Sequence, residues 1–112
     1  MKRKAKKHIT EQKYPQQCAE FEQIVNDLYS LHLDKNREYS PNNIRALGVL
    51  GCALRIHEKT IRLLNLLGWD PWQGKPTKAL TEVKFGGVEE ELKDIANIAI
   101  ISQILQRDKW AK

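Results

Sequence analysis

Hydrophobic residues recur at intervals of three and four along most of the chain, and this spacing predicts three helices. The first is expected from after Pro15 to about Asn36, the second from about Asn43 to Leu67, and the third from Val88 to about Arg107. Gly68 is a natural stop for the second helix, because glycine readily adopts the left-handed conformation that follows a helix end. No segment alternates in the way that strands do. The pattern therefore predicts an all-α fold, a small helical bundle with three main helices.

The predicted helices carry apolar stripes that should face a core. On the first helix the stripe comprises Phe21, Ile24, Val25, Leu28, Leu31 and His32. On the second it comprises Leu47, Leu50, Leu54, Ile61 and Leu64, with His57 expected in the core or at an interface. The third helix is apolar almost all round after Leu92, and such a helix must be covered on several sides. Three helices cannot easily provide that cover, so we expect a homo-oligomer formed by helix packing.

The segment between the second and third helices, residues 68–87, contains four glycines and two prolines and is predicted to be a long loop. It also carries Trp69 and Trp72. Two interpretations fit these tryptophans: a lid that stacks on a base, or a plug for the open end of the bundle.

Charge changes this picture less than the totals suggest. The 112 residues include 19 Lys plus Arg and 14 Asp plus Glu, a formal net charge of +5. Five of the basic residues lie among the first seven positions, so the rest of the chain is neutral overall. We therefore predict a basic flexible tail over residues 1–12 and a single all-α domain over residues 13–112. Three roles suit the tail: weak nucleic-acid contact through residues 2–7, attraction of phosphate near a site, or solubility.

Other features favour a cytoplasmic protein with no membrane segment. The basic N-terminus is followed by no apolar run of signal-peptide type. The longest aliphatic stretch, residues 95–101, is interrupted by Asn97 and is too short to span a bilayer. Cys18 and Cys52 lie far apart without CxxC spacing, so neither a disulfide framework nor a structural zinc site is expected.

Three acidic residues occupy unusual positions relative to the apolar stripes. Glu91 and Asp94 share a helix face with Ile98 and Ile101, and Glu58 lies at the edge of the apolar side of the second helix. Burying an unpaired carboxylate is expensive, and the usual solutions are ion pairing or metal coordination.

Both solutions are compatible with this pattern. Arg55 and Arg62 lie at i−3 and i+4 from Glu58 and could neutralise it. Alternatively, three inward-facing carboxylates form an oxygen-rich cluster suited to Mg²⁺ or Mn²⁺. Arg55, Lys59 and Arg62 would then take phosphate charge.

Three segments resemble those of a known family: residues 35–40 (KNREYS), 55–63 (RIHEKTIRL) and 91–101 (ELKDIANIAII). They are similar to those of the MazG-like all-α nucleoside triphosphate pyrophosphohydrolases, in particular their phage and bacterial branch, the nucleotide modification associated domain. The resemblance covers roughly residues 18–110. It implies a helical homodimer or homotetramer in which carboxylates of an ExxE and an ExxD motif bind Mg²⁺. It also implies hydrolysis of a nucleoside triphosphate to a monophosphate and pyrophosphate, in the cytoplasm of a cell or of a phage host.

Carried over to this sequence, Glu58 matches the second acid of ExxE, and Glu91 and Asp94 match ExxD. Arg55 stands in place of the first acid, so the full four-carboxylate cluster cannot be assembled from these two helices. Glu38 is a candidate for the missing metal ligand, or else a loop surface residue. The remaining residues are candidates for substrate binding: Lys35, Arg55, Lys59, Arg62 and Asn97. Asn97 is alternatively a support for a metal ligand. The alternative function is a non-catalytic nucleotide- or protein-binding module that keeps the scaffold and has lost the chemistry.

Overall fold

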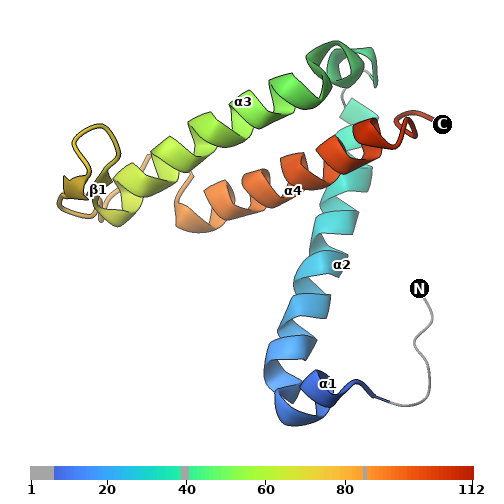
Figure 1. Ribbon diagram of the computed structural model, residues 1–112, viewed down its shortest axis with the longest axis horizontal. Helices are drawn as coiled ribbons and strands as arrows, with labels where there is room; N and C mark the ends of the chain where they lie inside the picture. The colour runs from blue at the N-terminus through green and yellow to red at the C-terminus, as the bar shows by residue number, and fades with distance from the viewer. Residues whose placement is uncertain (1–6, 39–40, 85) are drawn as a thin grey trace. The chain divides into compact units, whose positions relative to one another are not determined.

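The computed structural model describes residues 7–38, 41–84 and 86–112, and the side chains of residues 37, 38 and 41 lie outside this description. The described chain contains the helices α1 (Ile9–Lys13), α2 (Pro15–Glu38), α3 (Pro41–Leu67) and α4 (Val88–Gln106) (Figure 1). Two short strands, β1 (Trp69–Asp70) and β2 (Lys75–Pro76), lie between α3 and α4. Helical residues dominate, which confirms the predicted all-α class.

The chain divides into two compact units, Met1–Arg37 and Glu38–Lys112. The prediction of one domain over residues 13–112 stays a prediction, and the two units are described separately below. No helix among the described residues is long and apolar enough to cross a membrane.

The first unit consists of α1 and most of α2. His8 caps α1, because its Nδ1 accepts a hydrogen bond from the backbone N–H of Thr10 at 3.0 Å. Residues 9–12, expected in a flexible tail, therefore form part of a short helix, whereas residues 1–6 lie outside the described residues. Pro15 opens α2, as suits a residue with no N–H to satisfy.

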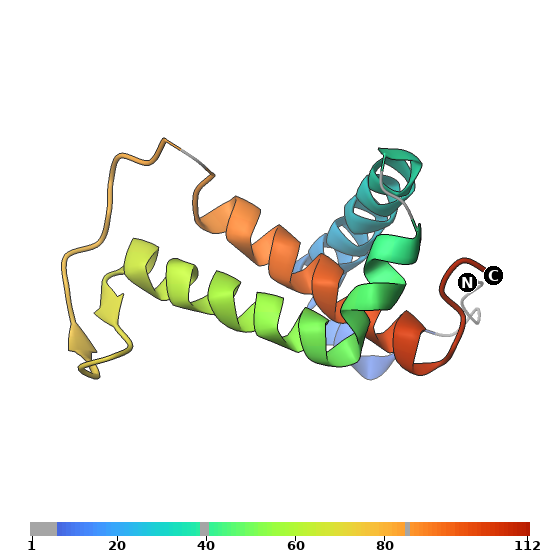
Figure 2. The ribbon, with the colours of Figure 1, turned by 90° about the horizontal axis from the view of Figure 1, so that it is seen from above.

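The second unit begins with α3, which is bent at Gly48. Gly48 has φ of 65° and ψ of −179°, a conformation that residues with a side chain avoid. Residues 41–47 therefore point in a different direction from residues 49–67 (Figure 2). An isolated glycine in a helical pattern is often tolerated without a bend, so the sequence did not predict this one.

The helices α3 and α4 lie side by side and antiparallel (Figures 1 and 2). Between them lies a core centred on Cys52, Ile101 and Trp110, the last contributed by the C-terminal turn. The partly buried residues packed against this centre are Ile44, Leu47, Ile98, Ile104 and Leu105. Arg45 donates a hydrogen bond from Nη2 to the carbonyl of Trp110 at 3.2 Å, which attaches the C-terminal turn to α3.

The predicted buried side of the second helix was partly wrong. Leu50 is 75 % exposed and Leu54 is 57 % exposed, whereas Cys52 is fully buried. Leu50 and Leu54 are each two positions from Cys52. They therefore lie about 160° away from it around the helix, because successive residues are about 100° apart. His57 is likewise exposed rather than in the core of this chain.

Gly68 ends α3 as predicted and starts a small hairpin that the sequence pattern did not predict. Its φ is +95°, and a Cβ there would lie 2.8 Å from the carbonyl oxygen of Thr77. The hairpin pairs β1 with β2 in antiparallel register, Trp69 opposite Pro76 and Asp70 opposite Lys75. Two-residue strands are too short to produce a recognisable alternation, which explains why only a loop was expected.

Candidate functional site

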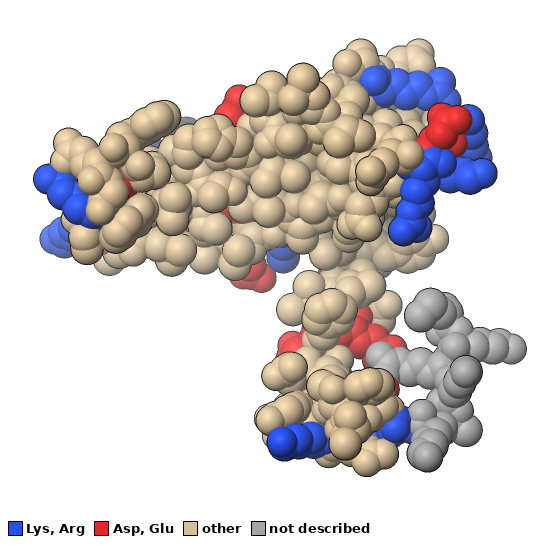
Figure 3. All heavy atoms as spheres, in the orientation of Figure 1, with Lys and Arg blue, Asp and Glu red and all other residues tan. Residues whose placement is uncertain are grey.

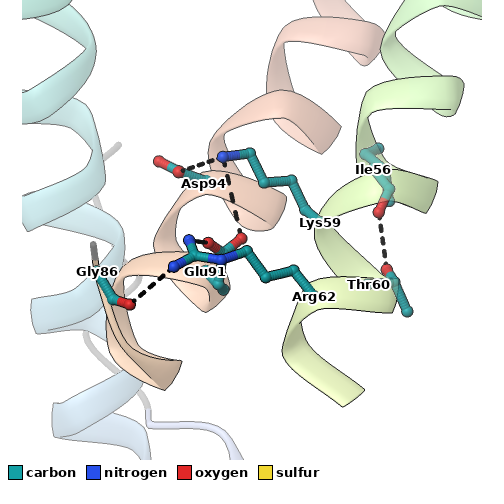
Figure 4. Close-up of polar contacts among 7 residues, drawn as sticks. All are labelled: Ile56, Lys59, Thr60, Arg62, Gly86, Glu91 and Asp94. Carbon is teal, nitrogen blue, oxygen red and sulfur yellow. Dashed lines mark hydrogen bonds and ion pairs between the residues drawn. The ribbon is translucent and has the colours of Figure 1, made fainter. Parts of the chain in front are cut away.

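Four charged side chains meet where the antiparallel helices α3 and α4 pack together (Figure 4). Lys59 and Arg62 lie one turn apart on α3, and Glu91 and Asp94 lie one turn apart on α4. Figure 4 shows the two basic side chains reaching across from α3 to the two carboxylates. The spacing of three residues on both helices places each pair on one face, so the pairs can meet where the helices pack.

Each basic side chain has its own main partner. Lys59 Nζ donates to Asp94 Oδ2 at 3.1 Å and lies 3.9 Å from Glu91 Oε2. Arg62 Nη1 donates to Glu91 Oε1, and its Nη2 donates to the carbonyl of Gly86 at 3.2 Å (Figure 4). Arg62 thus ties the segment preceding α4 to α3 as well as pairing with the acid.

Burial distinguishes Glu91 from its three neighbours. The Glu91 side chain is 1 % exposed, whereas those of Asp94, Lys59 and Arg62 are 28 %, 29 % and 40 % exposed. Glu91 Oε2 is buried and has no hydrogen-bond partner among the described residues. A carboxylate oxygen in this position has unused acceptor capacity, which normally costs free energy.

These residues meet because they lie on the apolar faces through which α3 and α4 pack together. On α3 the face towards α4 includes the buried Cys52 and Leu66, and Lys59 lies on the same face at helical spacing. On α4, Glu91 continues the stripe of Ile98 and the buried Ile101, as the sequence predicted. The inward position of Glu91 is therefore confirmed. Its buried charge is compensated by ion pairs with Lys59 and Arg62 of α3.

The other predicted site residues have different positions. Glu58 is exposed on α3, so the expectation that it faces inward is wrong, because Lys59 and not Glu58 lies on the α4 side. Arg55 is also exposed. Asn97 is buried on α4, one turn after Asp94. Lys35 belongs to α2 in the first unit.

The structure brings together fewer candidate metal ligands than the sequence suggested. Over residues 7–36, 42–84 and 86–112, no three His, Cys, Asp or Glu side chains lie close enough to hold one metal ion. The Glu38 side chain lies outside the described residues, so its predicted ligand role stays a prediction. Glu91 and Asp94 are the pair of carboxylates that the site retains.

The two tryptophans of the hairpin differ in exposure, and only Trp72 is largely presented to solvent. Trp72 is 81 % exposed and Trp69 is 38 % exposed. Asp70 Oδ1 accepts hydrogen bonds from the backbone N–H groups of Trp72 and Gln73 at 2.9 and 3.1 Å, which orders the turn. Trp72 therefore does not plug the end of the bundle in this chain.

No protein-family model, curated protein or solved structure matches this chain. The resemblance of residues 35–40, 55–63 and 91–101 to the MazG-like enzymes therefore stays a prediction.

Proposed function

We propose that the protein is a Mg²⁺-dependent nucleotide pyrophosphohydrolase that converts a nucleoside triphosphate to a monophosphate and pyrophosphate. The observation that carries the proposal is the buried Glu91 carboxylate, whose Oε2 has no hydrogen-bond partner among the described residues and which lies one turn from Asp94. The resemblance of residues 91–101 to an ExxD metal-binding segment adds support.

The two carboxylates fit Mg²⁺ in number and kind. Magnesium in nucleotide enzymes is usually held by one or two carboxylates, with phosphate oxygens and water completing the shell. Glu91 and Asp94 would provide those ligands, and Glu91 Oε2, which accepts no hydrogen bond from the described residues, has acceptor capacity left for a cation. When bound, the ion would activate a water molecule and neutralise phosphate charge.

The basic residues of the site have a direct role in this proposal. Lys59 and Arg62 have partly exposed side chains, so their charged ends can reach a phosphate chain at the surface. Arg62 offers a planar fork for two phosphate oxygens, and Lys59 offers a compact point charge. Together they would neutralise charge that develops on the leaving pyrophosphate.

The test is an assay of pyrophosphate release from a panel of nucleoside triphosphates with Mg²⁺. We expect release from at least one nucleotide, and loss of release in Asp94→Asn with the helical content unchanged. Glu89→Gln is the matched control, because Glu89 is 83 % exposed in the same helix and forms its ion pair with Lys93 at the surface. Absence of product across the whole panel would refute the catalytic proposal.

A second candidate, a non-catalytic nucleotide-binding module, is favoured by one observation. Glu58, the expected third carboxylate, is exposed, and Arg55 replaces the first acid of the motif. Calorimetry with the same nucleotides separates the candidates: binding of a nucleotide without pyrophosphate release identifies the module.

We further propose that the chain acts as a homo-oligomer formed by helix packing. Large apolar side chains are exposed on α2, among them Phe21 at 72 % and Ile24 at 54 %, and Leu50 and Leu54 are exposed on α3. On the face of the second unit seen in Figure 3, charged side chains gather near the ends and margins and leave the middle uncharged. Covering such surfaces with a second copy removes apolar area from water.

Light scattering after size exclusion tests the oligomer directly. We expect a mass of at least two chains, and a shift towards one chain for Leu54→Lys with retained helical signal. Glu89→Lys, at an 83 % exposed position of α4, is the charge-changing control, and it should leave the mass unchanged. A wild-type mass of one chain at all concentrations would refute the oligomer.

A further inference from the structure

The four charged residues of the site form a neutral set. Glu91 and Asp94 contribute two negative charges, and Lys59 and Arg62 contribute two positive charges at ion-pair distance. A divalent cation that approaches Glu91 or Asp94 therefore meets two basic groups already in place. The positive charges of the cation and of the two basic groups would repel each other strongly in such a partly buried site. The cation alone should bind this arrangement poorly.

The two sides of the set differ in their freedom to move. Glu91 is fully buried and held by the packing of α4, whereas Lys59 and Arg62 are partly exposed at the ends of long side chains. Lys59 approaches Glu91 Oε2 only to 3.9 Å and makes no hydrogen bond with it. Lys59 is held in the site by its hydrogen bond to Asp94 Oδ2 at 3.1 Å, and its flexible stem allows the ammonium group to reach other positions.

We propose that Lys59 and Arg62 exchange partners during binding, from the carboxylates in the free protein to phosphate oxygens when a metal–triphosphate complex enters. This inference rests on the proposed function and adds how binding to the site is controlled. The incoming complex supplies both the cation that replaces the basic groups on the carboxylates and the anion that those groups then pair with. Metal and triphosphate therefore bind with positive coupling, and free Mg²⁺ is largely excluded.

The exchange predicts effects of opposite sign from one substitution. Lys59→Gln removes a positive charge from the carboxylates, so the affinity for Mn²⁺ alone should rise about tenfold. The same substitution removes a phosphate partner, so the affinity for the Mg²⁺–tripolyphosphate complex should fall about tenfold. A residue with a purely structural role would weaken both.

The experiment titrates Mn²⁺ by electron paramagnetic resonance and Mg²⁺–tripolyphosphate by calorimetry on the full chain. Lys93→Gln is the matched control, because Lys93 is a neighbouring lysine of α4 whose ion pairs are with the exposed Glu89 and Glu90. It should change either affinity less than about threefold. Circular dichroism confirms that both variants keep the helical content of the wild type.

Changes of the same sign in the two titrations of Lys59→Gln, or no change in either, would overturn the exchange. Failure of every variant to bind Mn²⁺ would also overturn it. These outcomes differ from failure of the proposed function, since a protein that releases no pyrophosphate still gives both binding titrations. Conversely, an active enzyme whose Lys59→Gln variant keeps wild-type affinities would retain the function and lose the exchange.

Discussion

Replacing Arg62 with methionine tests the electrostatic design of the site through its stability. Methionine keeps much of the length and apolar character of the arginine stem, so the main loss is the guanidinium that pairs with Glu91 Oε1. Glu91 would then remain 1 % exposed with only Lys59, 3.9 Å from Oε2, as a compensating charge. The substitution therefore leaves a buried carboxylate with neither oxygen satisfied.

The expected cost follows from burial. Removing one partner of a fully buried ion pair costs about 3–5 kcal/mol. Arg62 is 40 % exposed and Lys59 remains, so water and the ammonium group offset part of this. We expect Arg62→Met to lower the free energy of unfolding by about 1–3 kcal/mol. Glu91→Gln removes the buried charge itself and should cost less than Arg62→Met.

Urea unfolding measures both losses of stability. The protomer concentration is kept fixed, because the stability of any oligomer depends on it. The double variant Arg62→Met/Glu91→Gln should recover part of the loss, giving a coupling free energy of about 1 kcal/mol or more. Lys93→Met, which breaks only exposed ion pairs, should cost less than about 0.5 kcal/mol. Equal costs for Arg62→Met and Lys93→Met would refute the reasoning.

Three further predictions concern the rest of the second unit. Trp110→Ala should lower the free energy of unfolding by about 3–5 kcal/mol in a urea titration, because Trp110 is buried in the core; a loss below 1 kcal/mol would contradict this. Gly68→Ala should cost more than about 1 kcal/mol in the same assay, because φ is +95° and the carbonyl of Thr77 lies 2.8 Å from the added Cβ; an unchanged midpoint would contradict it. The hydrogen bond and charge of Lys112 hold the pKa of Asp108 below its ordinary value, so any contribution of this pair to stability is present above the unfolded pKa and lost as pH falls through the folded one. In an NMR titration Lys112→Ala should raise the pKa of Asp108, and an unchanged midpoint would contradict the pairing.

The positions of the main helices could be predicted because each has a long apolar period, and Gly68 marks the end of the second. The bend at Gly48 could not, since a glycine within such a period is compatible with a straight helix. Trp110 follows the last helix and has no periodic signal, so its place in the core depends on the fold of the C-terminal turn.

The candidate site was predictable only where one helix determines it. Glu91 lies on the apolar stripe of its own helix, and its burial follows from that stripe alone. Its pairing with Arg62, and that of Lys59 with Asp94, depends on how α3 is rotated towards α4. That rotation differs from the predicted one, and as a result Lys59 and not Glu58 faces the carboxylates.

The most direct test of the central proposal compares Mg²⁺-dependent pyrophosphate release by the wild type, Glu91→Gln and Glu90→Gln. Glu90 neighbours Glu91 in the sequence but is 61 % exposed, so the pair isolates the effect of the buried carboxylate. We expect release by the wild type and Glu90→Gln, and a loss of at least about a hundredfold in Glu91→Gln. Pyrophosphate release by Glu91→Gln at the wild-type rate would contradict the proposed role of this site. Absence of release by the wild type with every nucleoside triphosphate would contradict it as well.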